Sequence, residues 1–364
     1  MTTYRLEGDY QDGRHPSRVS FTPDLEKDLA RRDFTINAMA LDRKGCLTDP
    51  FGGQADLENR SLRCVGDPVL RFQEDSLRIL RALRFRSRLG FEIEKQTAEA
   101  MTLEKDRMAL LSAERVGSEV LGILAGPYAG DTLDRYRDVF LAAVPLLAPT
   151  LECSQNCPYH YGTVYQHTVD ALKQLDREKA DSTTALAILF HDIGKPQVKT
   201  TDSQGRDHFY DHAPAGAELT RQALSALRYS KKLQEEVCQL VAFHSLQITP
   251  SKASVRRLLN KLGEEQLRRL IEVIRCDTLA HTSLALPRLQ TLEEFSKLLE
   301  ETLQEESAFS LKQLAVNGKD LTALGISPGP EMGAILHTLL EEVISGSEND
   351  RDALLARARQ LARK

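Results

Sequence analysis

The chain has 364 residues, of which 41% are hydrophobic and 28% charged, and its formal net charge at pH 7 is −5. This is the composition of an ordinary water-soluble protein of two or three domains, and it excludes a protein that binds nucleic acid through overall positive charge. Six cysteines, with no apolar signal segment or membrane-spanning run, predict reduced thiols, a cytoplasmic location and no membrane partner.

Two short strands are predicted at the start of the chain. Tyr4, Leu6 and Tyr10 precede the turn-forming segment QDGRHP, and Val19 and Phe21 alternate with polar residues after it. A hairpin of two strands is marginal by itself and needs more sheet or a helix to cover it. We therefore expect a part of this domain upstream of Met1.

A short amphipathic segment begins next with Arg31, Arg32 and Asp33. Two arginines can bind a triphosphate and an aspartate can accept a hydrogen bond from a ribose hydroxyl, although surface ion pairing explains the same residues. Further along, Gly52 and Gly53 predict a turn at which backbone segments approach closely.

The segment from Phe72 to Gly90 predicts a single helix with one apolar and one charged face. On the charged face, Asp75 is spaced to orient Arg78 and Arg81 as hydrogen-bond donors. A carboxylate accepts from an exocyclic amine and an arginine donates to ring nitrogens and carbonyls, so this pair would favour cytosine and adenine over uracil and guanine. For the helix considered alone, a solvated face with local ion pairs is the simpler interpretation.

Four motifs occur in a characteristic order: RRDFTINAMA, DPFGGQADL, EDSLRILRALRF, and AERVGSE at residues 113–119. This series resembles that of bacterial CCA-adding tRNA nucleotidyltransferases and their poly(A) polymerase relatives, class II of the polymerase-β-like superfamily. The resemblance implies tRNA, CTP and ATP as partners and Mg²⁺ as the cofactor of nucleotidyl transfer. The residues it assigns to the nucleotide site are Arg31, Arg32, Asp33, Asp75, Arg78, Arg81 and Arg84.

Within this set the resemblance implies different roles. The RRD residues would contact the ribose and phosphates of the nucleotide, Asp75 and Arg78 would pair with CTP and then ATP, and the later arginines would support their helix. Glu114, Arg115 and Glu119 would brace the neck against that helix.

The sequence departs from the family at one place. Upstream of RRDFT the family carries a Gly-Gly phosphate-binding turn and then two aspartates, separated by one residue, that hold the catalytic metals; neither is found in residues 1–30. Metals activate the attacking oxygen and offset charge on the leaving pyrophosphate. We therefore expect that this polypeptide does not add nucleotides. Glu7 is a candidate remnant of that site, although a strand carboxylate is more often solvated.

After Glu119 the pattern is helical, and an adjacent His191 and Asp192 follow an apolar helix, with other histidines and an aspartate at a distance. This constellation resembles the HD metal phosphohydrolase superfamily. Neutral imidazoles and carboxylates suit Mn²⁺, Fe²⁺, Ni²⁺ or Zn²⁺, and a bridging water would attack phosphorus. Lys195 could hold a phosphate as a point charge and completes the predicted catalytic group with His191 and Asp192. The predicted metal ligands are His167, His191, Asp192, His212, His244 and Asp277.

Other candidate ligands are set aside. Cys153, Cys157 and His160 lack a fourth ligand and have a poor spacing for zinc. The remaining histidines are not part of the HD constellation and are expected to be structural: His15, His208, His281 and His337.

The predicted fold is mainly α. A small α+β remnant of a polymerase-β-like nucleotidyltransferase head (1–58) precedes a helical neck with the nucleotide-recognition helix (59–125), an HD domain (126–290) and a helical tail (291–364). The leading function is that of the CCA-adding family; the alternatives are an HD-type phosphohydrolase acting on RNA ends and a non-catalytic tRNA-binding protein. CCA, A-only and poly(A) addition stay open at this point, as do the HD metal and the oligomeric state.

Overall fold

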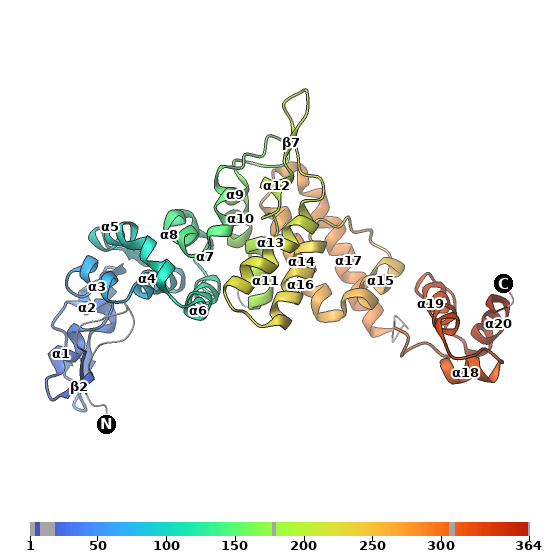
Figure 1. Cartoon of the computed structure of the whole chain (residues 1–364), viewed down its shortest axis with the longest axis horizontal. Helices are drawn as coiled ribbons and strands as arrows, with labels where there is room; N and C mark the ends of the chain where they lie inside the picture. Colours follow the sequence, from blue (N-terminus) through green and yellow to red (C-terminus); the bar gives the residue numbers. More distant parts are fainter. Residues whose placement is uncertain (1–3, 8–18, 177–179, 306–309, 363–364) are drawn as a thin grey trace. The chain divides into compact units, whose positions relative to one another are not determined.

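The computed structural model describes residues 4–7, 19–176, 180–305 and 310–362 (Figure 1). Helices dominate these residues, and the strands within them form separate two-stranded sheets, so the predicted mainly α class is confirmed. The chain divides into two compact units: residues 1–244 with 279–282, and residues 245–278 with 283–364. The bounds of the four predicted domains stay predictions.

The predicted hairpin forms at the start of the first unit. Strand β1 (Tyr4–Glu7) pairs antiparallel with β2 (Val19–Thr22), with Glu7 opposite Val19. Tyr10, His15 and the connecting segment lie outside the described residues. A small core of Leu29, Ala38 and Val65 follows. The elements that carry it are α1 (Leu25–Ala30), η1 (Thr35–Asn37), β3 (Ala40–Leu41), β4 (Leu47–Thr48), α2 (Gly53–Glu58) and β5 (Ser61–Leu62).

The predicted glycine turn precedes α2. Gly52 has a φ of 74°, in the left-handed region, and the Asp49 carboxylate accepts hydrogen bonds from the Gly53 and Gln54 amides at 2.7 and 2.9 Å. A Cβ on Gly53 would lie 2.3 Å from the Thr35 carbonyl oxygen, so the predicted close approach is confirmed. Burial alone would raise the pKa of Asp49, but the amides of Gln54 and Gly53 outweigh it and lower that pKa below its ordinary value.

The predicted single helix over 72–90 is wrong, because two helices meet at Asp75. Asp75 is extended (φ −146°, ψ 101°), and its carboxylate accepts from the Leu77 amide at 3.1 Å. Such a bond from a side chain to a nearby amide competes with the helical pattern, and periodicity does not register it. The elements of this region are α3 (Pro68–Glu74), α4 (Leu77–Leu89), β6 (Glu92–Ile93), α5 (Lys95–Glu104), η2 (Lys105–Leu110) and α6 (Ala113–Leu124).

The apolar face of α4 packs as its sequence predicts. Ile79, Leu80 and Leu83 are fully buried, and α4 packs against α6. Each such side chain contributes roughly 1.5–3 kcal/mol by leaving water. The opposite, charged face of α4 is thereby fixed relative to the α6 residues that approach it.

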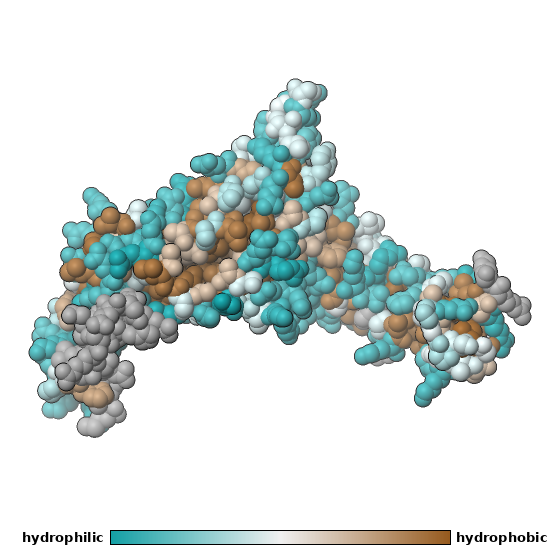
Figure 2. Space-filling model, viewed as in Figure 1, coloured by the Kyte–Doolittle hydropathy of each residue, from teal (hydrophilic) through white to brown (hydrophobic). Residues whose placement is uncertain are grey.

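Further helices complete the first unit. A Cβ on Gly194 would lie 2.2 Å from the His212 carbonyl oxygen and 2.5 Å from the Gly216 nitrogen, so only glycine lets the segment after His191 lie against α13. In Figure 2, hydrophobic residues reach the surface over the helices in the middle of the view. The elements are α7 (Ala129–Arg135), α8 (Arg137–Ala143), η3 (Pro145–Leu147), α9 (Pro149–Glu152), α10 (Val164–Lys173), α11 (Ser182–Phe190), α12 (Lys195–Val198), β7 (Thr200–Thr201), β8 (Asp207–His208), α13 (His212–Ala226) and α14 (Lys231–Phe243).

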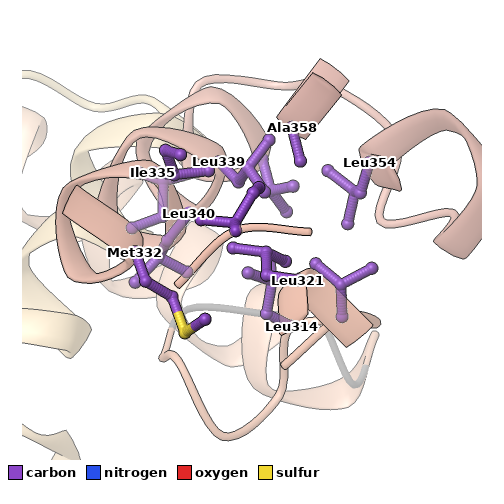
Figure 3. Close-up of a cluster of buried hydrophobic side chains, with 12 residues drawn as sticks. Leu314, Leu321, Met332, Ile335, Leu339, Leu340, Leu354 and Ala358 are labelled. Carbon is purple, nitrogen blue, oxygen red and sulfur yellow. The ribbon is translucent and has the colours of Figure 1, made fainter. Parts of the chain in front are cut away.

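The second unit has its own hydrophobic cluster, in which Leu321, Leu339 and Leu354 point toward one another (Figure 3). None of the helices that the structure describes is long and apolar enough to span a bilayer. The elements of this region are α15 (Lys252–Leu262), α16 (Glu264–Leu279), η4 (Ser283–Ala285), α17 (Pro287–Gln304), α18 (Gly318–Ala323), α19 (Pro330–Ile344) and α20 (Arg351–Leu361).

Candidate nucleotide and metal sites

The structure brings the RRD segment and α4 together. Arg81 Nε donates to Asp33 Oδ2 at 2.7 Å, and Arg78 Nη2 donates to the Arg31 carbonyl oxygen at 3.2 Å. Asp33 is buried and also accepts from the Phe34 amide at 3.0 Å. Two motifs almost fifty residues apart in sequence therefore form one polar surface.

The side-chain partner of Asp75 differs from the prediction. Its carboxylate lies 2.9 Å (Oδ2) and 3.2 Å (Oδ1) from Arg115 Nη2, so it does not pair with Arg78 or Arg81. Arg78 instead donates from Nη1 to Glu74 Oε2 at 2.7 Å. Spacing within a helix could not predict this exchange of partners, since Arg115 comes from α6.

Of the three residues expected to brace the neck against this helix, Glu119 bonds to α4 and Arg115 bonds to Asp75 just before it. Arg84 Nη1 lies 3.1 Å from Glu119 Oε1, and Arg115 holds Asp75 as described. Burial raises the pKa of Glu119, and the nearby charge of Arg84 only partly offsets this effect. Glu114 is exposed.

Arg31 and Arg32 share one partner, Asp28. Arg31 Nη2 lies 2.7 Å and Arg32 Nη2 3.5 Å from its two carboxylate oxygens. The Arg32 side chain is 45% exposed against 28% for Arg31, so Arg32 is the more accessible of the two cations to an incoming anion.

The residues around this surface do not fit the Mg²⁺ that nucleotidyl transfer uses. Asp28, Asp33 and Asp56 are each paired with an arginine. In the described part of the chain up to Glu152, no three His, Cys, Asp or Glu side chains converge as metal ligands. The expectation that this polypeptide does not add nucleotides stays a prediction.

Most of the metal ligands predicted from the HD resemblance come together in the structure. Two groups of ligand atoms, each within 4.8 Å of one another, share Asp192. One group adds His167 of α10 and His191 at the end of α11; the other adds His212, the first residue of α13, and His244 at the end of α14. This donor set of imidazoles and a carboxylate fits a divalent transition metal.

Local hydrogen bonds orient three of these imidazoles. Nδ1 of His191, His212 and His244 lies 2.8, 2.8 and 2.7 Å from the carbonyl oxygen of the residue three positions earlier. A carbonyl can only accept, so each Nδ1 carries the proton and each Nε2 is left as a metal donor. These Nε2 atoms lie 3.3 to 3.7 Å from the Asp192 carboxylate.

Asp192 is the buried centre of the cluster and is 1% exposed. Burial opposes its ionisation, but His191 and Lys195 outweigh that effect and hold the pKa of Asp192 well below its ordinary value. Lys195 Nζ lies 2.6 Å from Asp192 Oδ2 and donates to Gln155 Oε1 at 2.7 Å. The predicted catalytic lysine is thus a fixed cation beside the candidate metal ligands.

The remaining candidate metal ligands lie in different parts of the structure. Asp277 belongs to the second unit, where Arg288 Nη1 lies 3.3 Å from its carboxylate, and it stays a predicted ligand. His281, expected to be structural, lies in the first unit beside His160 and His167. Cys153 and Cys157 are free thiols, and no described candidate metal group contains a cysteine.

Family models match three parts of the chain. Residues 1–63 match the poly A polymerase head domain, residues 90–151 match the probable RNA and SrmB-binding site of polymerase A, and residues 209–358 match the putative tRNA nucleotidyltransferase domain 2. The first two matches include the RRD segment and Arg115.

Individual relatives match most of the chain. An A-adding tRNA nucleotidyltransferase of Deinococcus radiodurans is 35% identical, over 89% of this chain and 76% of its own. A CCA-adding enzyme of Levilactobacillus brevis is 34% identical, over 98% and 78%. Among solved structures, the CCA-adding enzyme of Bacillus stearothermophilus in complex with CTP is 26% identical with a TM-score of 0.72, over 100% of this chain and 78% of that one. Its motifs, its fold and these relatives together show that the chain belongs to the CCA-adding tRNA nucleotidyltransferase and poly(A) polymerase family.

Proposed function

We propose that the chain recognises CTP and ATP, the nucleotides that a CCA-adding enzyme joins to the 3′ end of tRNA. The observation that carries this proposal is the bond between Arg81 and Asp33, which joins the recognition helix to the RRD segment. Relatives named A-adding and CCA-adding enzymes, and a solved relative in complex with CTP, support the choice of nucleotides. Both A-adding and CCA-adding relatives match the chain. We propose recognition of cytosine as well as adenine, as CCA addition requires, because Asp75 and Arg78 can pair with either base.

Asp75 and Arg78 have the unused capacity that base recognition needs. An ionised carboxylate has about four acceptor positions, and those of Asp75 take the Leu77 amide and Arg115. Arg78 donates through Nη1 and Nη2 to Glu74 and to two carbonyl oxygens, out of about five N–H donors. An exocyclic amine beside a ring acceptor, as in cytosine and adenine, matches the remaining acceptor and donors.

The rest of the substrate is assigned to neighbouring residues. Arg32, the more exposed partner of Asp28, would contact the triphosphate, and Asp33 the ribose. Residues 90–151, matched by the RNA-binding family model, and the basic α20 would contact tRNA. A cytoplasmic location is proposed with this substrate.

Nucleotide binding tests the proposal without requiring turnover. The Kd of CTP, ATP, UTP and GTP is measured by calorimetry on the full chain and on Arg81→Gln, with Arg88→Gln, an exposed arginine of the same helix, as the matched control. CTP and ATP should bind about ten-fold or more tightly than UTP and GTP. Arg81→Gln should weaken CTP and ATP binding, whereas Arg88→Gln should not. Equal affinity for all four nucleotides would contradict the proposal.

A second function is favoured by the histidine cluster. Five of the six predicted ligands converge, so we propose that His167, His191, Asp192, His212 and His244 hold a divalent transition metal of an HD-type phosphohydrolase. When bound, such a metal lowers the pKa of a water and polarises a phosphoryl oxygen. The protein's own part is to keep each Nε2 unprotonated and to place Lys195 where it attracts a phosphate.

Asp192→Asn tests this second function. Asn keeps the size of the side chain and removes the charge shared by both groups, so Mn²⁺- or Ni²⁺-dependent hydrolysis of a cyclic phosphodiester should be lost. His337→Asn, an exposed histidine of the second unit, serves as the control for the purified preparation. Absence of hydrolysis by the unmodified chain with every divalent ion would remove the phosphohydrolase function.

A further inference from the structure

A third group of imidazoles lies beside the two that share Asp192. His160, His167 and His281 each place a ring nitrogen within 4.8 Å of the others. Their ring centroids are 4.2 Å (His160 and His281), 4.7 Å (His160 and His167) and 4.8 Å (His167 and His281) apart. Neither the HD constellation nor nucleotide recognition uses His160 or His281.

The two loops that carry His160 and His281 are fastened to each other. The Thr282 amide donates to the Tyr159 carbonyl oxygen at 2.9 Å, and Thr282 Oγ1 donates to the Pro158 carbonyl oxygen at 2.9 Å. The His160 loop is also closed on itself, since the Val164 amide donates to the Cys153 carbonyl oxygen at 2.9 Å. The backbones next to both histidines are therefore fixed by bonds that do not involve the rings.

The donor chemistry narrows the ligand to a metal ion that prefers nitrogen. Three imidazoles without a thiol or carboxylate suit Zn²⁺, whose nitrogen ligands lie at about 2.0–2.1 Å and hence roughly 3.3 Å apart in a tetrahedron. The side chains would close inward by about 1.5 Å at most, which rotation about χ1 and χ2 can supply. The Lys195 ammonium can only donate, so His160 Nε2 accepts from it and Nδ1 carries the proton, buried and without a hydrogen-bond partner among the described residues. Zinc would take the place of either the Lys195 contact at Nε2 or the proton at Nδ1.

We propose that His160, His167 and His281 form a zinc site of three histidines, separate from the group of Asp192, His212 and His244. His160 and His281 are half-buried, so a zinc ion can enter and a water can take the fourth position. Lys195 Nζ lies 3.3 Å from His160 Nε2, and the Asp192 carboxylate at 2.6 Å offsets its positive charge. A neutral imidazole has one lone pair, so zinc at this site and a metal in the group of His167, His191 and Asp192 exclude each other. The site binds Zn²⁺ whether or not the chain has either proposed activity.

Zinc content separates this site from its neighbours. The full chain and its variants are equilibrated with Zn²⁺, dialysed, and analysed by mass spectrometry for zinc per chain. In Asp192→Asn, which lacks the competing group, adding His281→Gln or His160→Gln should remove one zinc equivalent, or weaken its binding at least ten-fold. His337→Gln, at an exposed histidine, should retain the full content, and Asp192→Asn should lose only the zinc of the groups that it joins.

A second measurement covers the case in which a histidine variant does not fold, which circular dichroism detects. Asp192→Asn keeps all three histidines of the proposed site, and X-ray absorption of its remaining zinc should show a nitrogen shell with about three imidazoles at 2.0–2.1 Å. Unchanged zinc content when His281→Gln is added to Asp192→Asn, in a folded protein, would overturn the proposal. No bound zinc in Asp192→Asn would overturn it equally.

Discussion

Replacing Asp75 by Asn should change which pyrimidine the chain prefers. The carboxylate can accept from the amine of cytosine, whereas an amide NH₂ can donate to the O4 of uracil. Asn also keeps an oxygen that can accept from the Leu77 amide, but it loses the charge that pairs with Arg115. The substitution therefore changes base recognition, keeps the hydrogen bond from the Leu77 amide, and weakens the contact of Asp75 with α6.

The expected size of the effect follows from that exchange. A bidentate base contact is worth about 1–3 kcal/mol, so the ratio of the UTP and CTP dissociation constants should fall by about ten- to a hundred-fold. Asp75→Ala should relax the same ratio, and it should also lower the free energy of unfolding by about 1 kcal/mol because the acceptor for the Leu77 amide is lost.

Calorimetric titration of each variant with CTP and UTP measures the ratio, and urea denaturation measures the stability. Comparing Asn with Ala separates base recognition from loss of the helix junction. An unchanged CTP to UTP ratio in a folded Asp75→Asn protein would remove Asp75 from the base contact.

Three further predictions concern the head and the activity of this polypeptide. Gly53→Ala should destabilise the head by about 1–3 kcal/mol, since its Cβ would lie 2.3 Å from the Thr35 carbonyl oxygen; a denaturation midpoint equal to that of the unmodified chain would contradict this. Asp49→Ala should lower the free energy of unfolding by about 1 kcal/mol at pH 7. Because the pKa of Asp49 is lowered in the folded state, this loss should be complete above the unfolded pKa of about 3.8 and should disappear as the pH falls through the folded pKa. Urea denaturation of both proteins over a range of pH would measure it. From the motif departure in residues 1–30, the chain should not incorporate labelled CTP or ATP into tRNA that lacks its 3′ end, and robust incorporation would refute that inference.

The sequence predicted which residues meet better than it predicted how they pair. The meeting of the RRD segment with α4 followed from ordered motifs, and Arg81 does reach Asp33. The partner of Asp75 did not follow, because helical spacing favours residues three or four positions away and Arg115 is forty positions away.

The candidate metal ligands also include residues that local sequence patterns did not predict. Five of the candidate ligands predicted by their order in the chain come together, yet His281 was set aside as structural. His160, in a loop, and His167, in α10, lie more than a hundred residues before it, and the Thr282 bonds fasten the His160 loop beside His281. Two signals could have drawn notice: His281 closely follows the predicted ligand Asp277, and it lies two residues after the end of α16, as other histidines of the cluster follow helix ends.

The bonds that orient His191, His212 and His244 have an evolutionary consequence. Each ring is fixed by a carbonyl three residues earlier in the same short stretch of chain, so its protonation pattern is inherited with that stretch and needs no distant partner. Substitutions elsewhere can accumulate without changing which nitrogen is offered, provided that the three stretches still converge. Such a site is modular: it can be gained, lost or moved to another helical scaffold by changes at a few positions, independently of the nucleotide-binding head.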